Sequence, residues 1–367
     1  MSIALQTPSV PWADPTRQQK FSAWIRGLST KQHLDLKSLQ IASADASFRR
    51  YLRVQTDGGA KRTSMIIMDA PPDKENCEPF VRIARLMQDA GLLVPEVFDW
   101  NEEFGFMLMT DLGHQTMMAG LNTSDPQANL PMFLEATDRL IQWQLASKSG
   151  LLPVYDEALL KRELKTFPEW YVGRHLGKTL SADQSNVLDE AFRRIIAHNL
   201  QWPSVYVHRD YMPRNLMVNV FPQGAGAGTG TGIGILDFQD AVYGPITYDV
   251  ASLMRDAFLT WEEEFVLEVT IRYWEKARKA GLPVGDDFGA FYQGVEWMGL
   301  QRHLKVAGVF ARLTLRDGKP KYLADTPRFI QYIRSTCSRY MELKPLLRLV
   351  EKLEGIEFQS AFAYGRV

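Results

Sequence analysis

Apolar and polar residues alternate along the first part of the chain in a way that predicts a small sheet. Residues 1–20 read as a tail that leads into a short helix around residues 21–28. LQIASADASFRRYLRVQT, residues 39–56, has alternating segments on both sides of a small-residue turn, which is typical of a hairpin. SMIIMDA, residues 64–70, predicts a third strand, and VPEVFDWNEEFGFMLMTDLG, residues 94–113, predicts two more around a polar turn.

The apolar spacing changes to that of helices in the rest of the chain. Residues 79–90 already show this spacing, and Gly91 is well placed to end that helix. Beyond the sheet, only residues 204–240 interrupt the helical pattern, with short strand-like runs. We expect long amphipathic helices at about 131–148, 184–199, 246–259, 262–280, 287–310 and 326–354, the last with breaks.

These elements predict an α+β protein with two lobes. A β-rich N-lobe is expected over residues 1–110 and a larger, mostly helical C-lobe over residues 111–367. The length of 367 residues is sufficient for two domains or one large two-lobed domain. No internal repeat is present.

Composition narrows the classes of ligand. The 42 basic and 43 acidic residues leave a net charge of -1, so no global field attracts nucleic acid or an anionic membrane. No apolar run is long enough to span a bilayer, and the N-terminus lacks the features of a signal peptide, so we expect a cytoplasmic protein. Cys77 and Cys337 are far apart and without metal-ligand spacing, so both are expected to be buried thiols.

Two short segments within residues 204–240 carry the candidate chemistry. In VYVHRDYMPRNLMVN, residues 205–219, an apolar run precedes Asp210 and Asn215. In IGILDF a second apolar run ends at Asp237, and 27 residues separate the two aspartates. HRD-xxxx-N followed by a strand and Asp-Phe is the catalytic-loop and metal-site signature of kinase-like phosphotransferases. Each part is common alone, but their ordered occurrence is specific.

Phosphoryl transfer to a hydroxyl explains why these residue types occur. A carboxylate must orient the attacking hydroxyl and accept its proton, and Asp210 suits that role. Mg²⁺ on the nucleotide phosphates prefers oxygen ligands, which Asn215 and Asp237 provide. We therefore assign Asp210, Asn215 and Asp237 as catalytic, with Asn215 and Asp237 as the metal ligands.

The glycine-rich run GAGAGTGTGIG, residues 224–234, does not fit a phosphate-binding loop. A Walker loop requires a strand before it, a Lys-Ser/Thr pair and a helix after it. Here no lysine follows and the next element is the strand ILDF, so the run is interpreted as a hairpin tip.

HRDYMPRNLMVN together with ILDFQDAVYGPITYDVASLMRD resembles the aminoglycoside phosphotransferase and choline-kinase branch of the kinase-like fold. The resemblance implies a two-lobed protein-kinase-like fold, with ATP and Mg²⁺ bound between the lobes. It also implies that Asp249 supports the catalytic loop, while Asp240 extends the acidic cluster.

A narrower resemblance rests on ADASFRRYLRV, MDAPPDKENCEPF and QRHLKVAGVFARL. These segments are similar to those of bacterial anomeric amino-sugar kinases, and the similarity extends over roughly residues 20–355. It implies phosphorylation of N-acetylmuramate and N-acetylglucosamine at the 1-hydroxyl in cell-wall recycling. The expected partner is this small sugar, with no nucleic acid and no membrane, and the protein is expected to be a monomer.

The N-lobe departs from the protein-kinase pattern in two places. SADASFRR contains no glycine, so Ser47, Phe48 and Arg49 are expected to cover the nucleotide phosphates instead. The third strand reads MIIMDA and lacks the phosphate-binding lysine. The phosphate charge must then be met by magnesium and by an arginine, for which Arg49, Arg50 and Arg53 are candidates, and Glu78 is a candidate for the helix glutamate.

MLMTDLG resembles the linker between the lobes of a kinase. Adenine is expected to pair with backbone groups of Met109, Thr110 and Asp111, and to lie between the side chains of Ile67 and Met217.

Two helical segments are candidates for the acceptor site. LKRELKTFPEWYVGRHLG, residues 160–177, contains Glu163 and Trp170, and a carboxylate with aromatic rings suits a sugar. VEWMGLQRHLKVAGVFARL contains Arg302 and His303 within an otherwise apolar helix, where charged residues are costly unless they pair or line a cavity. A packed helix explains either segment equally well. Arg302 is the hypothetical contact for the lactyl carboxylate of muramate.

Two alternatives remain. The acceptor could be another small hydroxyl compound, such as an aminoglycoside, choline or homoserine, although the cations of Arg302, His303 and Lys305 disfavour a cationic acceptor. The chain could also be a catalytically dead kinase-like module that binds a partner. The missing lysine and glycines favour that second alternative, and the intact Asp210, Asn215 and Asp237 argue against it.

Overall fold

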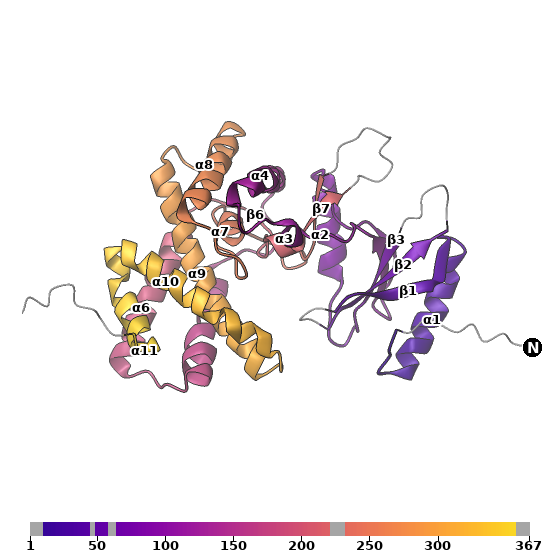
Figure 1. Cartoon of the computed structure of the whole chain (residues 1–367), viewed down its shortest axis with the longest axis horizontal. Helices are drawn as coiled ribbons and strands as arrows, with labels where there is room; N and C mark the ends of the chain where they lie inside the picture. The colour runs from indigo at the N-terminus through magenta and orange to yellow at the C-terminus, as the bar shows by residue number, and fades with distance from the viewer. Residues whose placement is uncertain (1–9, 45–47, 58–63, 221–231, 357–367) are drawn as a thin grey trace, which may run out of the picture. The chain divides into compact units, whose positions relative to one another are not determined.

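The computed structural model of the chain describes residues 10–44, 48–57, 64–220 and 232–356 (Figure 1). These residues belong to two units, one made of residues 1–120 and 214–240 and the other of residues 121–213 and 241–367. The segments 111–120 and 214–240, which the sequence assigned to the helical lobe, therefore group with the sheet. The glycine-rich run 224–234 lies largely outside the described residues.

An antiparallel sheet of five strands forms the centre of the first unit. Its strand order is β1-β2-β3-β5-β4, and every neighbouring pair is antiparallel. β5 is buried along its whole length. The strands are β1 (Leu34–Ala44), β2 (Arg50–Thr56), β3 (Ser64–Asp69), β4 (Val97–Asn101) and β5 (Phe106–Thr110).

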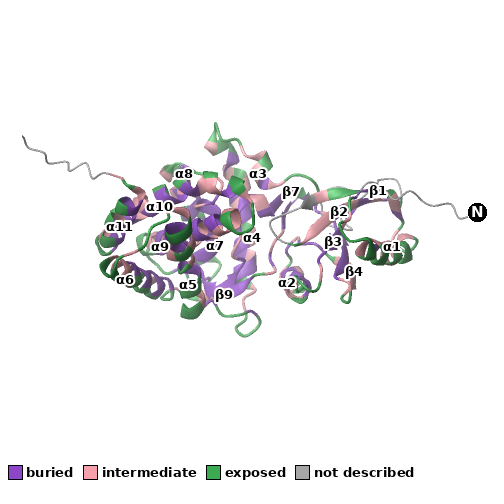
Figure 2. Cartoon of the chain, turned by 90° about the horizontal axis from the view of Figure 1, so that it is seen from below, coloured by how far each residue is buried: buried purple, intermediate pink, exposed green. Residues whose placement is uncertain are grey.

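Helix α1 (Pro15–Ser29) lies beside β1 in both views of the chain (Figures 1 and 2). It begins earlier than predicted, because Asp14 caps its first turn by accepting a hydrogen bond from the Thr16 N–H and Pro15 occupies the first helical position. Phe21 and Ile25 pack with apolar residues of the sheet. The helix thus extends the core beyond the sheet.

Helix α2 (Glu78–Asp89) also belongs to this unit, and Gly91, at φ +77°, follows it as predicted. Its Phe80 packs on Phe238, with ring centroids 4.8 Å apart. A short helix α3 (Met117–Gly120) and the hairpin of β7 (Leu216–Val220) and β8 (Gly232–Ile235) complete the unit.

Helices make up most of the second unit. Its longest helix, α9, packs against α5, α6, α7, α8 and α10, and the side of it that faces them is buried (Figure 2). The helices are α4 (Leu130–Leu145), α5 (Glu157–Leu164), α6 (Ala182–Asn199), α7 (Tyr248–Met254), α8 (Glu263–Lys279), α9 (Phe288–Leu315), α10 (Thr326–Arg339) and α11 (Lys344–Glu354). A π-helical segment, η2 (Phe167–His175), follows α5, and short 3-10 turns of this unit are η1 (Pro126–Asn129), η4 (Pro320–Asp325) and η5 (Met341–Leu343). A further 3-10 turn, η3 (Pro213–Asn215), begins at the last residue of one segment of this unit and continues into the first unit.

In the described part of the second unit, a pair of strands precedes and follows the segment that contains the HRD motif. β6 (Ser204–Val207) pairs antiparallel with β9 (Val242–Pro245). The sequence analysis predicted β6 but not β9, because VYGP is short and ends in a proline. Gly244 of β9 lies against Tyr155, where an added Cβ would come within 2.6 Å of the tyrosine Cβ.

Two further predictions can be compared with the structure. Cys77 and Cys337 are free and buried, which confirms their interpretation as core thiols. Among the described residues, none of the helices combines the length and the apolar character required to cross a membrane.

We predict that Gly105→Ala destabilises the protein by about 3 kcal/mol or more. Gly105 has φ +68°, and a Cβ added there would lie 1.8 Å from the Ala70 carbonyl oxygen. Gly285 is a matched control, because its φ is +72° and open space surrounds it. Gly285→Ala should cost only about 1 kcal/mol, from backbone strain. Chemical unfolding of both variants measures the difference, and equal losses would show that the Ala70 carbonyl is not the constraint.

Candidate active site

The loop after β6 is held by one buried carboxylate. Asp249, in the first turn of α7, accepts hydrogen bonds from the backbone N–H groups of His208, at 2.6 Å, and Arg209, at 3.0 Å. The imidazole of His208 accepts a further bond from the N–H of Asp210, at 3.3 Å. Three consecutive amides of the HRD segment are therefore directed by buried side chains.

Arg209 adopts a left-handed backbone conformation, with φ +77°. A non-glycine residue in this region carries a conformational cost on the order of 1–3 kcal/mol, so surrounding contacts must hold it. Its carbonyl oxygen accepts a hydrogen bond from Arg302 at 2.6 Å, and its guanidinium pairs with Glu163 at 2.6 Å. The backbone therefore turns sharply immediately before Asp210.

The electrostatic state of Asp249 reflects two opposing effects. Burial disfavours its charged form and raises the pKa of the carboxyl to about 7, although the two backbone N–H groups and the nearby Arg302 lower it. Asp249 is completely buried, so these hydrogen bonds are its compensation for lost hydration.

Glu163 is the centre of a second buried group beside the loop. Burial alone would raise the pKa of this carboxyl, but the cations of Lys305 and Arg209 outweigh burial and lower the pKa to about 2. Lys305 lies 3.0 Å away, and the hydroxyl of Tyr155 donates a short hydrogen bond to the other carboxylate oxygen. Glu163 is thus ionised and fully engaged with protein groups.

Asn215 and Asp237 are brought together within the first unit. Leu216 of β7 pairs with Ile235 of β8, and the N–H of Leu236 donates to the Asn215 carbonyl at 2.9 Å. The side-chain amide of Asn215 donates to Asp237 at 3.3 Å. The ladder between the two strands therefore brings together the two side chains that the motif predicted as ligands.

This donor set fits Mg²⁺. The ion commonly takes one or two protein oxygen ligands and completes its shell with water and phosphate oxygens. Asp237 supplies a carboxylate that is further contacted by the Gln239 amide at 2.9 Å, and Asn215 adds an amide beside it. Within the described residues, no group of three or more His, Cys, Asp or Glu is arranged to hold a metal.

The residues predicted to contact adenine lie in different surroundings. Met109 and Thr110 end β5 and are buried, and Asp111 follows them. Ile67 is enclosed in the core that α1 covers. Met217 belongs to a separate apolar cluster with Leu112 and Val220. The partly buried side chains of Leu93 and Leu236 pack against this cluster.

The three arginines considered for the phosphates all pair with carboxylates. Arg49 lies 3.1 Å from Glu75, which also accepts a hydrogen bond from the Phe48 N–H at 3.1 Å. Ser47, also predicted to cover the phosphates, lies outside the described residues. The other two pairs are Arg50 with Asp69, at 2.7 Å, and Arg53 with Asp111, at 2.5 Å.

Glu75 was missed by the sequence analysis, which considered Glu78 for the helix-glutamate role. Glu78 stands at the exposed first turn of α2 and pairs with Arg82, four residues along the same helix, at 3.2 Å. Arg17 was missed too; it pairs with Asp69 at 2.5 Å from helix α1. Sequence spacing carries no signal for either contact, since each joins residues that are distant in the chain.

The predicted acceptor residues of α9 are buried. Arg302 is 4% exposed, and its guanidinium lies over the ring of Tyr248, 4.8 Å from the centroid. His303 stacks on Tyr332, with centroids 4.5 Å apart, and its Nε2 lies 3.1 Å from the Arg255 carbonyl. Burial lowers the pKa of His303 to about 3, so its imidazole is neutral. Trp170, in the π-helical segment, is half-buried with Arg174 over its ring.

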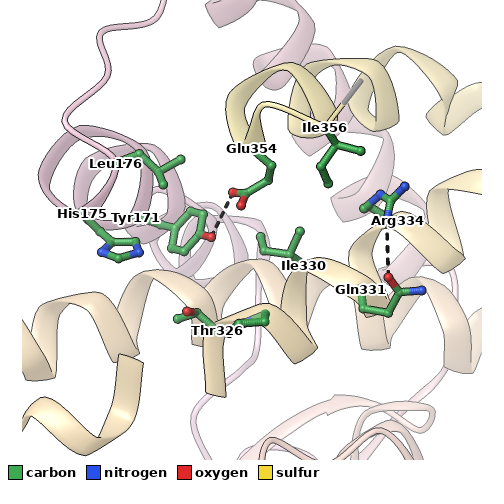
Figure 3. A pocket seen from close by; sticks show the side chains of 10 residues that line it. Tyr171, His175, Leu176, Thr326, Ile330, Gln331, Arg334, Glu354 and Ile356 are labelled. Carbon is green, nitrogen blue, oxygen red and sulfur yellow. Dashed lines mark hydrogen bonds between the residues drawn. The ribbon is translucent and has the colours of Figure 1, made fainter. Parts of the chain in front are cut away.

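A cavity of about 330 Å³ lies elsewhere in the second unit (Figure 3). Tyr171 and Glu354 meet at its edge through a hydrogen bond of 2.9 Å, and Arg334 lies across from them, bonded to Gln331. Tyr171, His175 and Leu176 of this lining belong to the candidate acceptor segment 160–177, but Glu163 and Trp170, the residues predicted from that segment, do not line the cavity.

Comparisons with known sequences agree with one another. The model of a family described as "Phosphotransferase enzyme family" matches residues 38–286. An N-acetylmuramate/N-acetylglucosamine kinase of Neisseria meningitidis serogroup B is 45% identical over 350 residues, covering 95% of this chain and 99% of that protein. A kinase of the same name from Pseudomonas aeruginosa is 45% identical over 317 residues, covering 86% of this chain and 89% of that protein.

Solved structures show that the fold is protein-kinase-like. An ethanolamine kinase of Plasmodium vivax matches with a TM-score of 0.60 at 11% identity, covering 90% of this chain and 92% of its own. A macrolide 2'-phosphotransferase of Brachybacterium faecium matches with a TM-score of 0.54 at 14% identity, covering 84% of this chain and 98% of its own. The predicted fold class is thereby confirmed.

We predict that Glu163→Gln destabilises the protein at neutral pH by on the order of 3 kcal/mol, because the variant leaves two buried cations without an anion. The folded state depresses the pKa of Glu163 from its ordinary 4.5 to about 2. Its contribution is therefore complete above about pH 4.5 and is lost as the pH falls toward 2. Urea unfolding of wild type and variant between about pH 6 and pH 3 should show the stability gap narrowing. A gap independent of pH would contradict the ion-pair assignment.

Proposed function

Because this chain belongs to the phosphotransferase enzyme family, we propose that it transfers the terminal phosphoryl group of ATP to the 1-hydroxyl of N-acetylmuramate and N-acetylglucosamine. The two Asp249 hydrogen bonds that shape the HRD loop carry the phosphotransferase part of the proposal. The choice of sugars is supported by relatives that share 45% identity over most of the chain and bear those substrates in their names. Cell-wall recycling would be the setting.

Asp210 is the proposed catalytic base. It follows the left-handed Arg209 directly, so its position along the loop is determined by a backbone that three neighbouring side chains hold. In the transfer, its carboxylate orients the sugar hydroxyl and receives its proton as the oxygen attacks the γ-phosphorus. An anomeric hydroxyl is more acidic than an ordinary alcohol, so positioning contributes more than basicity.

Asn215 and Asp237 are the proposed magnesium ligands. Bound Mg²⁺ would neutralise charge on the phosphate oxygens. Gln239 restrains the Asp237 carboxylate through a hydrogen bond of 2.9 Å, and the β7-β8 ladder restrains Asn215. These contacts keep both oxygen donors ordered before the ion arrives.

Arg49 is the proposed substitute for the missing phosphate-binding lysine. Its guanidinium is anchored by Glu75, whose other carboxylate oxygen holds the Phe48 N–H. An arginine paired with a carboxylate in this way resembles in chemistry the lysine–glutamate pair of protein kinases. Met109, Thr110, Asp111 and Met217 remain the proposed surroundings of adenine.

The acceptor is proposed to be neutral or anionic. Arg209, Arg302 and Lys305 all lie near Asp210 in the second unit and interact with it electrostatically. These cations lie among the carboxylates of Glu163, Asp210 and Asp249, so the site offers a cationic acceptor such as an aminoglycoside or choline no uncompensated anion. Trp170 remains a proposed contact for the sugar face, and the cytoplasmic location and monomeric state remain predictions.

The first test is phosphoryl transfer from ATP with Mg²⁺ to each sugar, with the product position assigned by phosphorus NMR. We expect a sugar 1-phosphate, and Asp210→Asn should lower kcat by about 10²- to 10⁴-fold because the proton acceptor is lost. Asp189→Asn, an exposed aspartate on α6, is the matched control and should behave as wild type. If neither sugar is phosphorylated while choline, homoserine or an aminoglycoside is, the proposed substrate is wrong.

Arg49→Ala should raise the KM for ATP by about 10- to 100-fold, the value of one charge-assisted hydrogen bond. Glu75→Gln should act in the same direction but more weakly, since Arg49 is retained with a poorer anchor. Arg82→Ala, which removes a partly exposed arginine on α2, is the control. Steady-state kinetics at saturating sugar measure these changes. An unaltered KM for ATP in Arg49→Ala would contradict the proposed phosphate contact.

A further inference from the structure

The backbone N–H, the carbonyl and the guanidinium of Arg209 each contact a different helix. Asp249 of α7 accepts from its N–H at 3.0 Å, and Arg302 of α9 donates to its carbonyl at 2.6 Å. Glu163 of α5 pairs with its guanidinium at 2.6 Å. A non-glycine residue is disfavoured at φ +77°, so we infer that the three contacts hold Arg209 in this conformation.

Glu163 has little capacity left for a substrate. One carboxylate oxygen is shared by Arg209, at 2.6 Å, and Lys305, at 3.0 Å. The other accepts the hydroxyl hydrogen of Tyr155. With both oxygens bound and 7% of the residue exposed, the carboxylate faces protein groups.

The contacts of Glu163 continue around Arg209 as a ring of side chains. Lys305 also donates to the Tyr248 hydroxyl, at 3.5 Å. The Tyr248 ring stands edge-on to Tyr155, with centroids 5.2 Å apart, and lies under the guanidinium of Arg302, 4.8 Å from its centroid. Such a connected buried network rigidifies what it encloses when its polar groups have partners.

We propose that Glu163, with Lys305 as its second cation, is a positioning residue that fixes Arg209 and thereby the direction of the Asp210 side chain. The inference rests on the proposed function and adds to it, because it assigns Glu163 a role on the loop in place of contact with the sugar. A displacement of about 1 Å in the base can cost roughly 100-fold in rate. Glu163 would therefore act on kcat without touching a substrate.

The decisive variant is Glu163→Gln/Lys305→Met. It removes one negative and one positive charge together, so only Arg209 loses its anion, whereas Glu163→Gln alone leaves both Arg209 and Lys305 without one. Arg209 retains only a neutral partner. Glu169→Gln/Lys165→Met is the matched control, because it removes the same two charges from exposed neighbours on η2 and the end of α5.

We expect the Glu163→Gln/Lys305→Met variant to lose about 10- to 100-fold in kcat, with the KM for sugar and for ATP changed by less than about two-fold. Its melting temperature should lie between those of Glu163→Gln and wild type, because one cation instead of two loses its anion. The control should match wild type throughout. Wild-type kcat in a folded double variant would overturn the proposal. A raised KM for sugar at unchanged kcat would also overturn it, since that pattern is expected of a direct sugar contact.

Hydrogen exchange tests the positioning role of Glu163 without relying on catalytic activity, so it can fail independently of the proposed function. The amides of His208 and Arg209 are bonded to Asp249, and their exchange should become about ten-fold faster in the double variant and stay unchanged in the control. If wild type phosphorylates neither sugar, the proposed function fails, and exchange alone decides the positioning role. Unchanged exchange at both amides would then overturn it.

Discussion

The hydrogen bonds from two loop amides to the buried carboxylate of Asp249 are the interaction on which the candidate site depends. They hold the backbone of His208 and Arg209 at the end of β6 and bring the chain into the left-handed turn before Asp210. Burying a carboxylate is costly, and the raised pKa of Asp249 reflects that cost. The fold offsets it with the two amides and with the nearby guanidinium of Arg302.

Buried charge of both signs surrounds this interaction. The cations of Arg209, Arg302 and Lys305 lie among the carboxylates of Glu163, Asp210 and Asp249. Removing one member of such a group leaves an uncompensated charge, which is why the network constrains sequence and geometry together.

The first unit also pairs its arginines with carboxylates. The strand that carries a lysine in protein kinases ends here in Asp69, which pairs with Arg17 and Arg50. Arg49 instead pairs with Glu75 beside the segment proposed to cover the nucleotide. An arginine–carboxylate pair thus stands where the sequence shows neither the glycines nor the lysine of a kinase.

The elements that the sequence predicted correctly are those with strong local signals. Strands β1 to β5 and helix α2 follow from alternation, helical spacing and Gly91, and the HRD and Asp-Phe segments follow from motif spacing. The early start of α1 depends on the N-cap at Asp14. Strand β9 has only four residues, which is too short to show an alternation of apolar and polar positions. Glu75 and Arg17 could not be found, because their partners are remote in the chain.

The sequence by itself determined the type of chemistry, since Asp210, Asn215 and Asp237 occur in an order that specifies a hydroxyl phosphotransferase. The family resemblance of the sequence also implied that Asp249 supports the loop. Only the tertiary structure decided which polar groups pair with each other. Glu163 pairs with Arg209 and Lys305, and Arg302 donates to the backbone carbonyl of Arg209. Motif residues are close in the chain, whereas these contacts join separate helices, and only packing of the core decides which helices meet.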